Sequence, residues 1–151
     1  MTGARLRSAV RDDFPALEAL LSASDLPVAG VREAVDGFVV AELDGAVVGA
    51  AGLERYGNSV LLRSVAVAPP LRGTGLGERL VAMVLEAATR SGAEACYLLT
   101  TTAEQWFPRF GFERITRAEV PAPVHQSLEF TEACPASAIV MRRRLSAEGA
   151  S

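Results

Sequence analysis

The sequence predicts a single α+β domain, built on a mixed and mostly antiparallel sheet of about seven strands with helices on both faces. The chain has 151 residues, of which 50% are hydrophobic. This length and composition suit one core large enough to fold unaided, without a second domain. Residues 38–68 hold three strand-like segments joined by short turns, and a glycine-rich turn then leads into an amphipathic helix. A meander followed by a strand–turn–helix unit is typical of an α+β fold.

The first 37 residues predict one strand followed by helical segments. Residues 5–10 alternate polar and apolar side chains, which indicates a strand. Asp12 or Asp13 then suits the cap of a helix. Its apolar positions are Phe14, Leu17, Leu20 and Leu21. Residues 26–37 have a weak pattern, and we expect a connection with a short helical piece at 31–35.

The next three segments predict consecutive antiparallel strands. The segments are residues 38–43, 46–56 and 59–68, and they are separated by Asp44-Gly45 and Gly57-Asn58. Asp-Gly between two apolar runs is a strong hairpin signal, and Gly-Asn also suits a two-residue turn.

After the glycine-rich turn, the pattern predicts a helix and three further strands. The helix carries its apolar face on Leu80, Val81, Val84, Leu85 and Ala88, and it ends at Gly92. The strands are expected at 95–102, 111–118 and 136–145, with a short helix or turn at 103–110 and a proline-containing loop at 119–135. We therefore place the domain at residues 1–145 and a frayed tail at 146–151.

Charge and composition exclude several classes of protein. The formal net charge is -3, so a nucleic acid is not the expected partner. The sequence has neither a signal-peptide pattern nor about 18 consecutive apolar residues, which predicts a cytoplasmic protein without a membrane partner. Cys96 and Cys134 lie far apart without a ligand-spaced partner, so we expect ordinary core or loop cysteines and no metal site.

The turn Arg72-Gly73-Thr74-Gly75-Leu76-Gly77 is not one of two well-known phosphate loops. A dinucleotide fingerprint needs a third glycine where this chain has Glu78, and a P-loop needs a Gly-Lys pair that the chain lacks. Glycines before a helix still expose backbone N–H groups at the positive end of the helix dipole. The turn therefore predicts an anion site, to which Arg72 adds a charge; the alternative is a turn that merely connects strand to helix.

These residues resemble the GNAT superfamily of N-acetyltransferases, whose coenzyme A signature R/Q-x-x-G-x-G/A matches residues 72–77. The preceding "LRSVAVAPPLRG" resembles the family's fourth strand, and "WFPRFGFE" resembles the segment that follows its fifth strand. The order of predicted elements is also that of the family. The resemblance implies acetyl-CoA as cofactor. Its pyrophosphate would lie on the N–H groups of Arg72, Gly73, Thr74, Gly75, Leu76 and Gly77, and its pantetheine arm along the backbone of Val65, Ala66 and Val67.

Acetyl transfer to an amine needs a neutral amine, donors for the oxyanion and a proton for the leaving thiolate. Many members of the family carry a tyrosine that protonates the thiolate, at the position that Phe107 occupies here. The remaining candidates for the acid are Tyr97, Tyr56, Cys134 and bulk water, and we take Tyr97 with Glu54 as the catalytic pair.

Glu54 is the candidate general base, because it interrupts an apolar strand. The Gly57-Asn58 turn places it opposite Leu61 and diagonal to Arg63, so a plain cross-strand ion pair is the competing interpretation. Arg63 is expected on one face with Leu61, Val65 and Val67. His125, the only histidine, is expected to be a solvated loop residue.

Within the superfamily, the sequence resembles the small arsenic-resistance N-acetyltransferases and, more distantly, the acetyltransferase domain of N-acetylglutamate synthase. Both resemblances imply a small carboxylated amine as substrate, either an amino acid or a toxic analogue such as an organoarsenical or a phosphinic amino acid. The resemblance to the synthase domain also assigns Arg63 and Ser137 to substrate binding. A homodimer is left open.

Two other functions stay open. The missing tyrosine is compatible with a non-catalytic coenzyme A sensor or partner-binding module. An acetyltransferase of peptide or protein amines is the third possibility.

Overall fold

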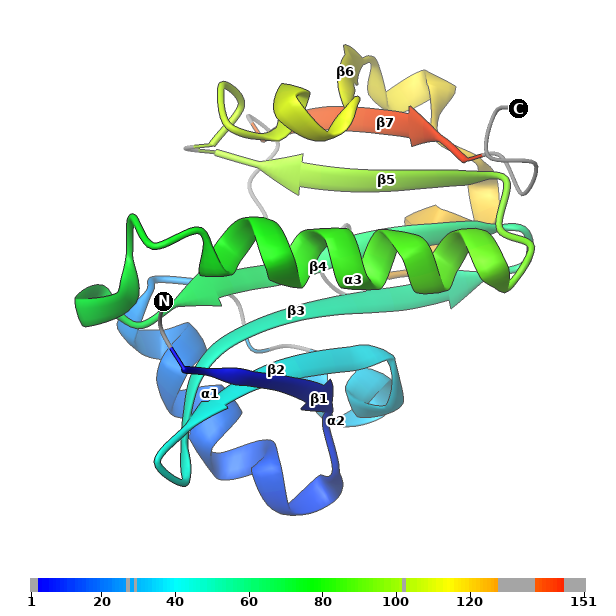
Figure 1. Ribbon diagram of the computed structural model, residues 1–151. Helices are drawn as coiled ribbons and strands as arrows, with labels where there is room; N and C mark the ends of the chain where they lie inside the picture. Colours follow the sequence, from blue (N-terminus) through cyan, green and yellow to red (C-terminus); the bar gives the residue numbers. More distant parts are fainter. Residues whose placement is uncertain (1–2, 27, 29, 102, 128–137, 146–151) are drawn as a thin grey trace.

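The computed structural model describes residues 3–26, 28, 30–101, 103–127 and 138–145 of the chain (Figure 1). The strands are β1 (Arg5–Ser8), β2 (Phe38–Leu43), β3 (Ala46–Tyr56), β4 (Ser59–Val67), β5 (Ala95–Thr100), β6 (Glu113–Ile115) and β7 (Ile139–Arg144). The α-helices are α1 (Phe14–Ala23), α2 (Val31–Ala34) and α3 (Leu76–Arg90). The 3-10 turns are η1 (Arg11–Asp13), η2 (Val35–Gly37), η3 (Pro69–Leu71), η4 (Phe107–Phe110), η5 (Arg117–Glu119) and η6 (Ala122–Gln126).

The strands form one seven-stranded sheet in the order β1-β2-β3-β4-β5-β7-β6. Every neighbouring pair is antiparallel except β4 and β5, which are parallel. The predicted α+β class and mixed sheet are confirmed. So are both hairpins, because the turns at Asp44-Gly45 and Gly57-Asn58 join β2 to β3 and β3 to β4.

Helices cover both faces of the sheet, as predicted. Figure 1 shows α3 lying across one face and α1 on the opposite side. Leu80, Val81 and Val84 of α3 pack in one core with Val60 and Leu62 of β4. On the other face, α1 packs through its apolar residues Leu17, Leu20 and Leu21 against Ala50 and Ala66. The small side chains of these two alanines let the helix approach β3 and β4 closely.

Several predicted boundaries differ from the structure. The strands predicted at 95–102 and 111–118 end earlier or are shorter, at Ala95–Thr100 and Glu113–Ile115. The loop predicted at 119–135 contains η6 in its described part. The predicted tail, 146–151, lies outside the described residues.

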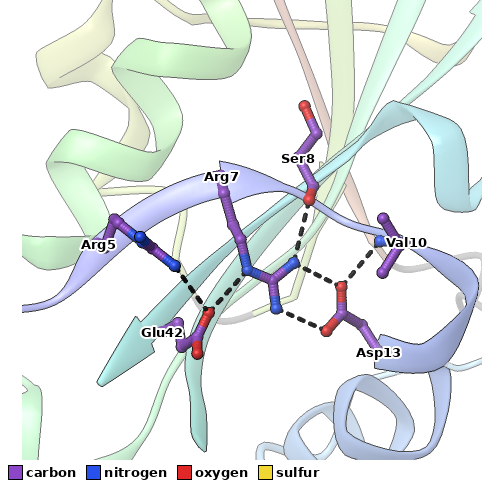
Figure 2. A network of polar contacts seen from close by, with 6 residues as sticks. All are labelled: Arg5, Arg7, Ser8, Val10, Asp13 and Glu42. Carbon is purple, nitrogen blue, oxygen red and sulfur yellow. Dashed lines mark hydrogen bonds and ion pairs between the residues drawn. The ribbon is translucent and has the colours of Figure 1, made fainter. Parts of the chain in front are cut away.

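The predicted helix cap is wrong in its chemistry. Asp13 stands at the N-cap position of α1, but its side chain makes no capping hydrogen bond. Its carboxylate instead accepts two 2.8 Å hydrogen bonds from the Arg7 guanidinium of β1 and one from the Val10 N–H (Figure 2). Arg7 also donates to Glu42 of β2 over 2.8 Å. These contacts fix the start of α1 to the edge of the sheet.

Candidate functional site

The glycine turn between η3 and α3 presents its backbone to open space. Gly73 and Gly75 have φ angles of +81° and +86°, in the left-handed region that glycine adopts without strain. A Cβ built on either residue would meet no atom within 4 Å. Gly75 is also the N-cap of α3, whose first N–H groups lack partners within the helix. The geometry is that of an anion cradle.

A pocket of about 380 Å³ opens in front of this turn. Five of the predicted cofactor residues line it: Val67, Arg72, Gly73, Gly75 and Gly77. Glu78, Trp106 and Arg109 complete part of its wall. Two of the other four predicted positions support the turn, since the Thr74 hydroxyl donates to the Leu71 carbonyl over 2.6 Å and the Leu76 side chain is buried in the core.

Strand β4 separates from β5 on its way to this pocket. The parallel ladder joins Ser59, Val60 and Leu61 to Ala95, Cys96 and Tyr97, and β4 continues to Val67 beyond the end of that ladder. The main chain of residues 65–67 therefore borders the widening gap between the two strands. An extended ligand can add to such an edge through main-chain hydrogen bonds.

A β-bulge at Ser64 changes the direction of β4 at the start of this gap. Ala50 pairs with Ala66 but Gly52 pairs with Arg63, so β4 holds one extra residue. Ser64 takes a left-handed φ of 61°, which is uncommon outside glycine. Its hydroxyl accepts a 2.8 Å hydrogen bond from Arg63 Nε.

The bulge overturns part of the predicted strand face. Leu61 packs in the cluster that contains Tyr97 and Val124, whereas Val65 and Val67 pack against the core beneath α3. Arg63 lies opposite Gly52, two residues from the Glu54–Leu61 pair, and so shares the face of Leu61. The prediction that Val65 and Val67 lie on that face is wrong, because the extra residue reverses the alternation of side chains.

Four polar side chains meet on the face of the sheet that carries Leu61. We call these residues, Glu54, Tyr56, Arg63 and Ser127, the Glu54 cluster. Glu54 Oε2 accepts from Arg63 Nη1 over 2.8 Å. Glu54 Oε1 accepts from the Tyr56 hydroxyl over 2.6 Å and from the Ser127 hydroxyl over 2.5 Å. The side chain of Arg63 is 0% exposed and that of Glu54 is 8% exposed. The cross-strand ion pair that competed with the base assignment is therefore present.

Burial and the hydrogen bond to Glu54 raise the pKa of Tyr56 to about 12. Its hydroxyl consequently keeps its proton at neutral pH and remains a donor. Glu54 and Tyr56 also line an open pocket of about 490 Å³, together with Gly37 of η2 and Leu53 of β3. The cluster thus combines a buried guanidinium, a carboxylate and two hydroxyls, and two of its members, Glu54 and Tyr56, reach a pocket large enough for a small molecule.

A protein-family model described as "Acetyltransferase (GNAT) domain" matches residues 34–114. The chain belongs to the GNAT acetyltransferase family. The matched segment runs from the end of α2 into β6, so it includes the β4 bulge, the glycine turn and α3. Membership makes the chain an acetyltransferase domain, and acetyl-CoA is the acetyl donor of the family.

Curated relatives of this GNAT domain include amino-acid acetyltransferases. The chain is 33% identical over 89 residues to one from Aeromonas salmonicida, and 37% identical over 86 residues to one from Ralstonia nicotianae. The alignments cover 58% and 56% of this chain, but 20% and 19% of the relatives. The chain thus spans about a fifth of the length of these curated relatives.

Solved GNAT structures superpose on nearly the whole chain. Rv2747 from Mycobacterium tuberculosis, solved in complex with CoA, gives a TM-score of 0.79 at 27% identity and covers 93% of this chain and 99% of its own. N-acetylglutamate synthase from Neisseria gonorrhoeae, complexed with coenzyme A and N-acetyl-glutamate, gives a TM-score of 0.80 at 24% identity. That match covers 94% of this chain and 35% of the synthase, and it supports the fold alone.

The position of the family's usual tyrosine lies in an aromatic cluster. Phe107 is 8% exposed, and its ring packs edge-on against Trp106 and Phe112 at centroid distances of 5.0 and 5.9 Å. A phenyl ring at this point offers no proton to a thiolate.

The structure does not bring Tyr97 into the Glu54 cluster. Glu54, Leu61 and Tyr97 occupy one row across β3, β4 and β5, so two strand spacings separate Tyr97 from Glu54, about 10 Å between Cα atoms. Tyr97 is 5% exposed and lies at the point where the β4–β5 ladder ends.

The remaining candidates are placed as follows. Cys96 is buried in the core, as predicted, and burial raises the pKa of its thiol to about 12. His125 is half-buried, with Nε2 at 3.2 Å from the Val120 carbonyl oxygen, so the prediction of a solvated residue is wrong. Ser137 and Cys134 lie outside the described residues.

Sequence reasoning missed Ser127, and it named Tyr56 only as an alternative acid without placing it beside Glu54. Tyr56 follows Glu54 by two positions on a strand, and that period-two spacing could have placed both side chains on one face. Ser127 follows η6 directly and lies far from Glu54 in the sequence, so no local pattern signals its contact.

Proposed function

We propose that this GNAT domain transfers the acetyl group of acetyl-CoA to the amino group of a small carboxylated amine, an amino acid or an amino-acid-like compound. The observation that carries this proposal is the buried Arg63 guanidinium beside the β4 bulge. A buried arginine requires an anion, and its planar fork suits a carboxylate. The similarity to amino-acid acetyltransferases supports the same class of substrate.

The glycine turn fits the cofactor's pyrophosphate. The open space in front of Gly73 and Gly75 leaves room for a phosphate, and the first turn of α3 supplies N–H donors. We assign residues 72–77 to the pyrophosphate and the main chain of Val65, Ala66 and Val67 to the pantetheine arm. When bound, acetyl-CoA supplies an acetyl group activated as a thioester.

The Glu54 cluster suits the acceptor. Arg63 would hold the substrate carboxylate, and Ser137 is proposed as a further contact. The Arg63 side chain is 0% exposed and pairs with Glu54. Binding of the substrate carboxylate therefore requires the side chains around the guanidinium to move aside, and the substrate then shares the guanidinium with Glu54. Glu54 would take the ammonium proton, directly or through a water, since an aliphatic amine with a pKa near 10 arrives mostly protonated.

The proton for the leaving thiolate needs another source than Phe107. Tyr97 is our candidate, because it lies at the end of the ladder between β4 and β5. The thioester of an acetyl-CoA bound along residues 65–67 would reach this point. The separation of Tyr97 from Glu54 fits a mechanism in which the acid and the base act on different sides of the reacting carbonyl.

The test is thiol release from acetyl-CoA across a panel of free amino acids, their amides, short peptides, and organoarsenical and phosphinic amino acids. The proposal expects turnover of one or more carboxylated amines and little turnover of the matching amides. Turnover of peptides alone would favour a peptide acetyltransferase. Cofactor binding without any turnover would favour a non-catalytic coenzyme A sensor, a function with which the phenyl ring at Phe107 is also compatible.

A further inference from the structure

The pocket of the glycine turn contains an acid that phosphate binding does not explain. Glu78 belongs to the first turn of α3 and lines the same pocket as Gly73, Gly75 and Arg72. A carboxylate here is stabilised by the N-terminal end of the helix dipole. It also repels any phosphate that enters the pocket, because both groups seek the same positive field.

A guanidinium from a distant segment neutralises this acid. Arg109 of η4 places Nη1 at 3.0 Å from Glu78 Oε2. Both side chains stay partly open to solvent, at 49% exposure for Arg109 and 44% for Glu78. Arg109 also lines the pocket, so its charge faces the space in which we place the cofactor's phosphates.

Trp106 holds Arg109 in this position independently of Glu78. Arg109 Nε donates to the Trp106 carbonyl over 2.9 Å, and the guanidinium carbon lies 5.3 Å from the centroid of the indole ring. The indole is itself packed on the glycine turn, since a Cβ on Gly77 would lie 3.4 Å from it. Arg109 can therefore change its ionic partner without losing its two contacts to Trp106.

We propose that Arg109 is a further cofactor-binding residue and that Glu78 is a placeholder for a phosphate. In the free domain Arg109 pairs with Glu78; in the loaded domain it pairs with a phosphate group of coenzyme A, and Glu78 turns to solvent. No bond is made or broken, because the step exchanges one ion pair for another. The proposal rests on the proposed function, since it assumes that the cofactor's phosphates occupy this pocket.

This exchange makes the two residues act in opposite directions on affinity. Arg109 strengthens binding through a charge-assisted hydrogen bond, which a planar guanidinium makes well to phosphate. Glu78 weakens binding, because it competes for Arg109 and repels the ligand. An acid in this position would thereby favour release of the spent cofactor.

The test is the dissociation constant of coenzyme A, measured by calorimetry at low salt. Arg109→Ala should weaken binding by about tenfold, as expected for the loss of one hydrogen bond to a charged group. Glu78→Gln should instead tighten binding, by about threefold for an exposed charge near a helix terminus. Both effects should shrink in 0.5 M salt, where exposed charges are screened.

Matched controls are available on the same helix. Arg79→Ala removes an exposed positive charge next to Glu78, from a side chain that lines a different pocket. Glu86→Gln removes an exposed acid whose partner, Arg90, lies one turn further along α3. Neither control should change the affinity for coenzyme A beyond about twofold, the range of a small screened surface effect.

Two cofactor fragments identify which phosphate Arg109 meets. If it meets the 3′-phosphate, the penalty of Arg109→Ala disappears with dephospho-coenzyme A. If it meets the pyrophosphate, the penalty persists with dephospho-coenzyme A and disappears with acetyl-pantetheine. Either pattern supports the proposal.

Two results would overturn it. Equal affinity of the wild type and Arg109→Ala for coenzyme A, or weaker binding by Glu78→Gln, would leave the ion pair as a purely structural contact. Failure of the wild-type protein to bind coenzyme A would instead overturn the proposed function, and the placeholder role with it.

Discussion

The carboxylate of Glu54 and the guanidinium of Arg63 form a buried ion pair across β3 and β4, with 2.8 Å between Oε2 and Nη1. One strand therefore serves two sites. Arg63 stands just before the bulge of β4 and belongs to the Glu54 cluster, while Val67 at the end of the same strand lines the pocket of the glycine turn. A cofactor lying along residues 65–67 would end close to a substrate held at Arg63, which is the proximity that acetyl transfer needs.

The glycine turn provides the first prediction. Gly75→Glu should weaken acetyl-CoA binding at least about tenfold, because it adds a carboxylate within a few ångströms of the proposed phosphates. Calorimetry measures the effect. Gly57→Glu is the matched control: Gly57 also has a positive φ and open space around its Cβ, but it lies in the β3–β4 turn. An unchanged affinity in a folded Gly75→Glu protein would refute the cofactor assignment.

Phe107 supplies the second prediction. Phe107→Tyr should keep kcat within about tenfold of the wild type, because the proposed chemistry does not use this position, and a hydroxyl that reaches the thiolate would raise kcat. The buried hydroxyl needs a partner in the aromatic cluster, so we expect stability to fall by about 1 kcal/mol. A loss of kcat of more than about tenfold, or about 1.4 kcal/mol of barrier, in a variant that is still folded under the assay conditions would show that the phenyl ring contacts the substrate.

The contacts of Arg7 predict a stability effect. Arg7→Leu should destabilise the domain by about 2 kcal/mol, because it leaves the nearly buried Asp13 carboxylate without its guanidinium. Arg5→Leu is the control on the same strand. Arg5 is 76% exposed and lies 3.7 Å from Glu42, so its loss should cost less than about 0.5 kcal/mol. Urea unfolding at pH 7 compares the two variants.

The Arg7–Asp13 pair also predicts how the difference in stability between wild type and Arg7→Leu depends on pH. The hydrogen bonds from Arg7 hold the pKa of Asp13 below its usual range. A carboxyl with a lowered pKa in the folded state stabilises the protein above the pKa of the unfolded chain, and the stabilisation is lost as pH falls through the folded value. The difference between wild type and Arg7→Leu should therefore be full at pH 7 and shrink below about pH 4. A constant difference from pH 7 to pH 3 would contradict this account.

The order of elements along the chain and both hairpins could be predicted because their signals are local. Asp44-Gly45 and Gly57-Asn58 define their turns, and the second turn also places Glu54 opposite Leu61, which brings Arg63 within reach. The bulge could not be predicted, because the residue in the left-handed conformation is Ser64 rather than a glycine. Because of this one extra residue, Val65 and Val67 lie on the face of the sheet opposite to the predicted one.

Long-range partners account for the remaining differences. Asp13 looked like a helix cap because it precedes α1, yet its carboxylate is held by Arg7 of the neighbouring strand. Ser127 joins Glu54 only because η6, which it follows, packs against β3 and β4. Such contacts depend on the tertiary arrangement, and neither propensity nor periodicity encodes them.

The role of Glu54 as a general base can be tested by the pH dependence of the activity that Glu54→Gln loses. Glu54→Gln keeps the shape of the side chain and should lower kcat by about 100-fold at pH 7, within the range of general base catalysis. If Glu54 takes the amine's proton, the activity of the variant should recover as pH rises toward 10, where more of the substrate arrives neutral. Glu113→Gln, on the exposed strand β6, is the control. A loss that is the same at every pH, with a raised KM, would show that Glu54 only positions Arg63.

Arg63 is predicted to recognise the carboxylate of the substrate. Arg63→Lys keeps the positive charge but loses the fork that now contacts both Glu54 and Ser64, so it should raise KM for a carboxylated amine and leave acetyl-CoA binding intact.

A second measurement of the role of Arg63 compares the best substrate with its amide. The wild type should discriminate strongly against the amide, whereas Arg63→Ala should not. Because Arg63→Ala also leaves Glu54 buried without its cation, at a cost of about 3–5 kcal/mol, the double variant Arg63→Gln/Glu54→Gln provides a folded protein without either charge. If all these proteins showed the same preference for carboxylate over amide, Arg63 would be left with its ion pair to Glu54 as its whole role.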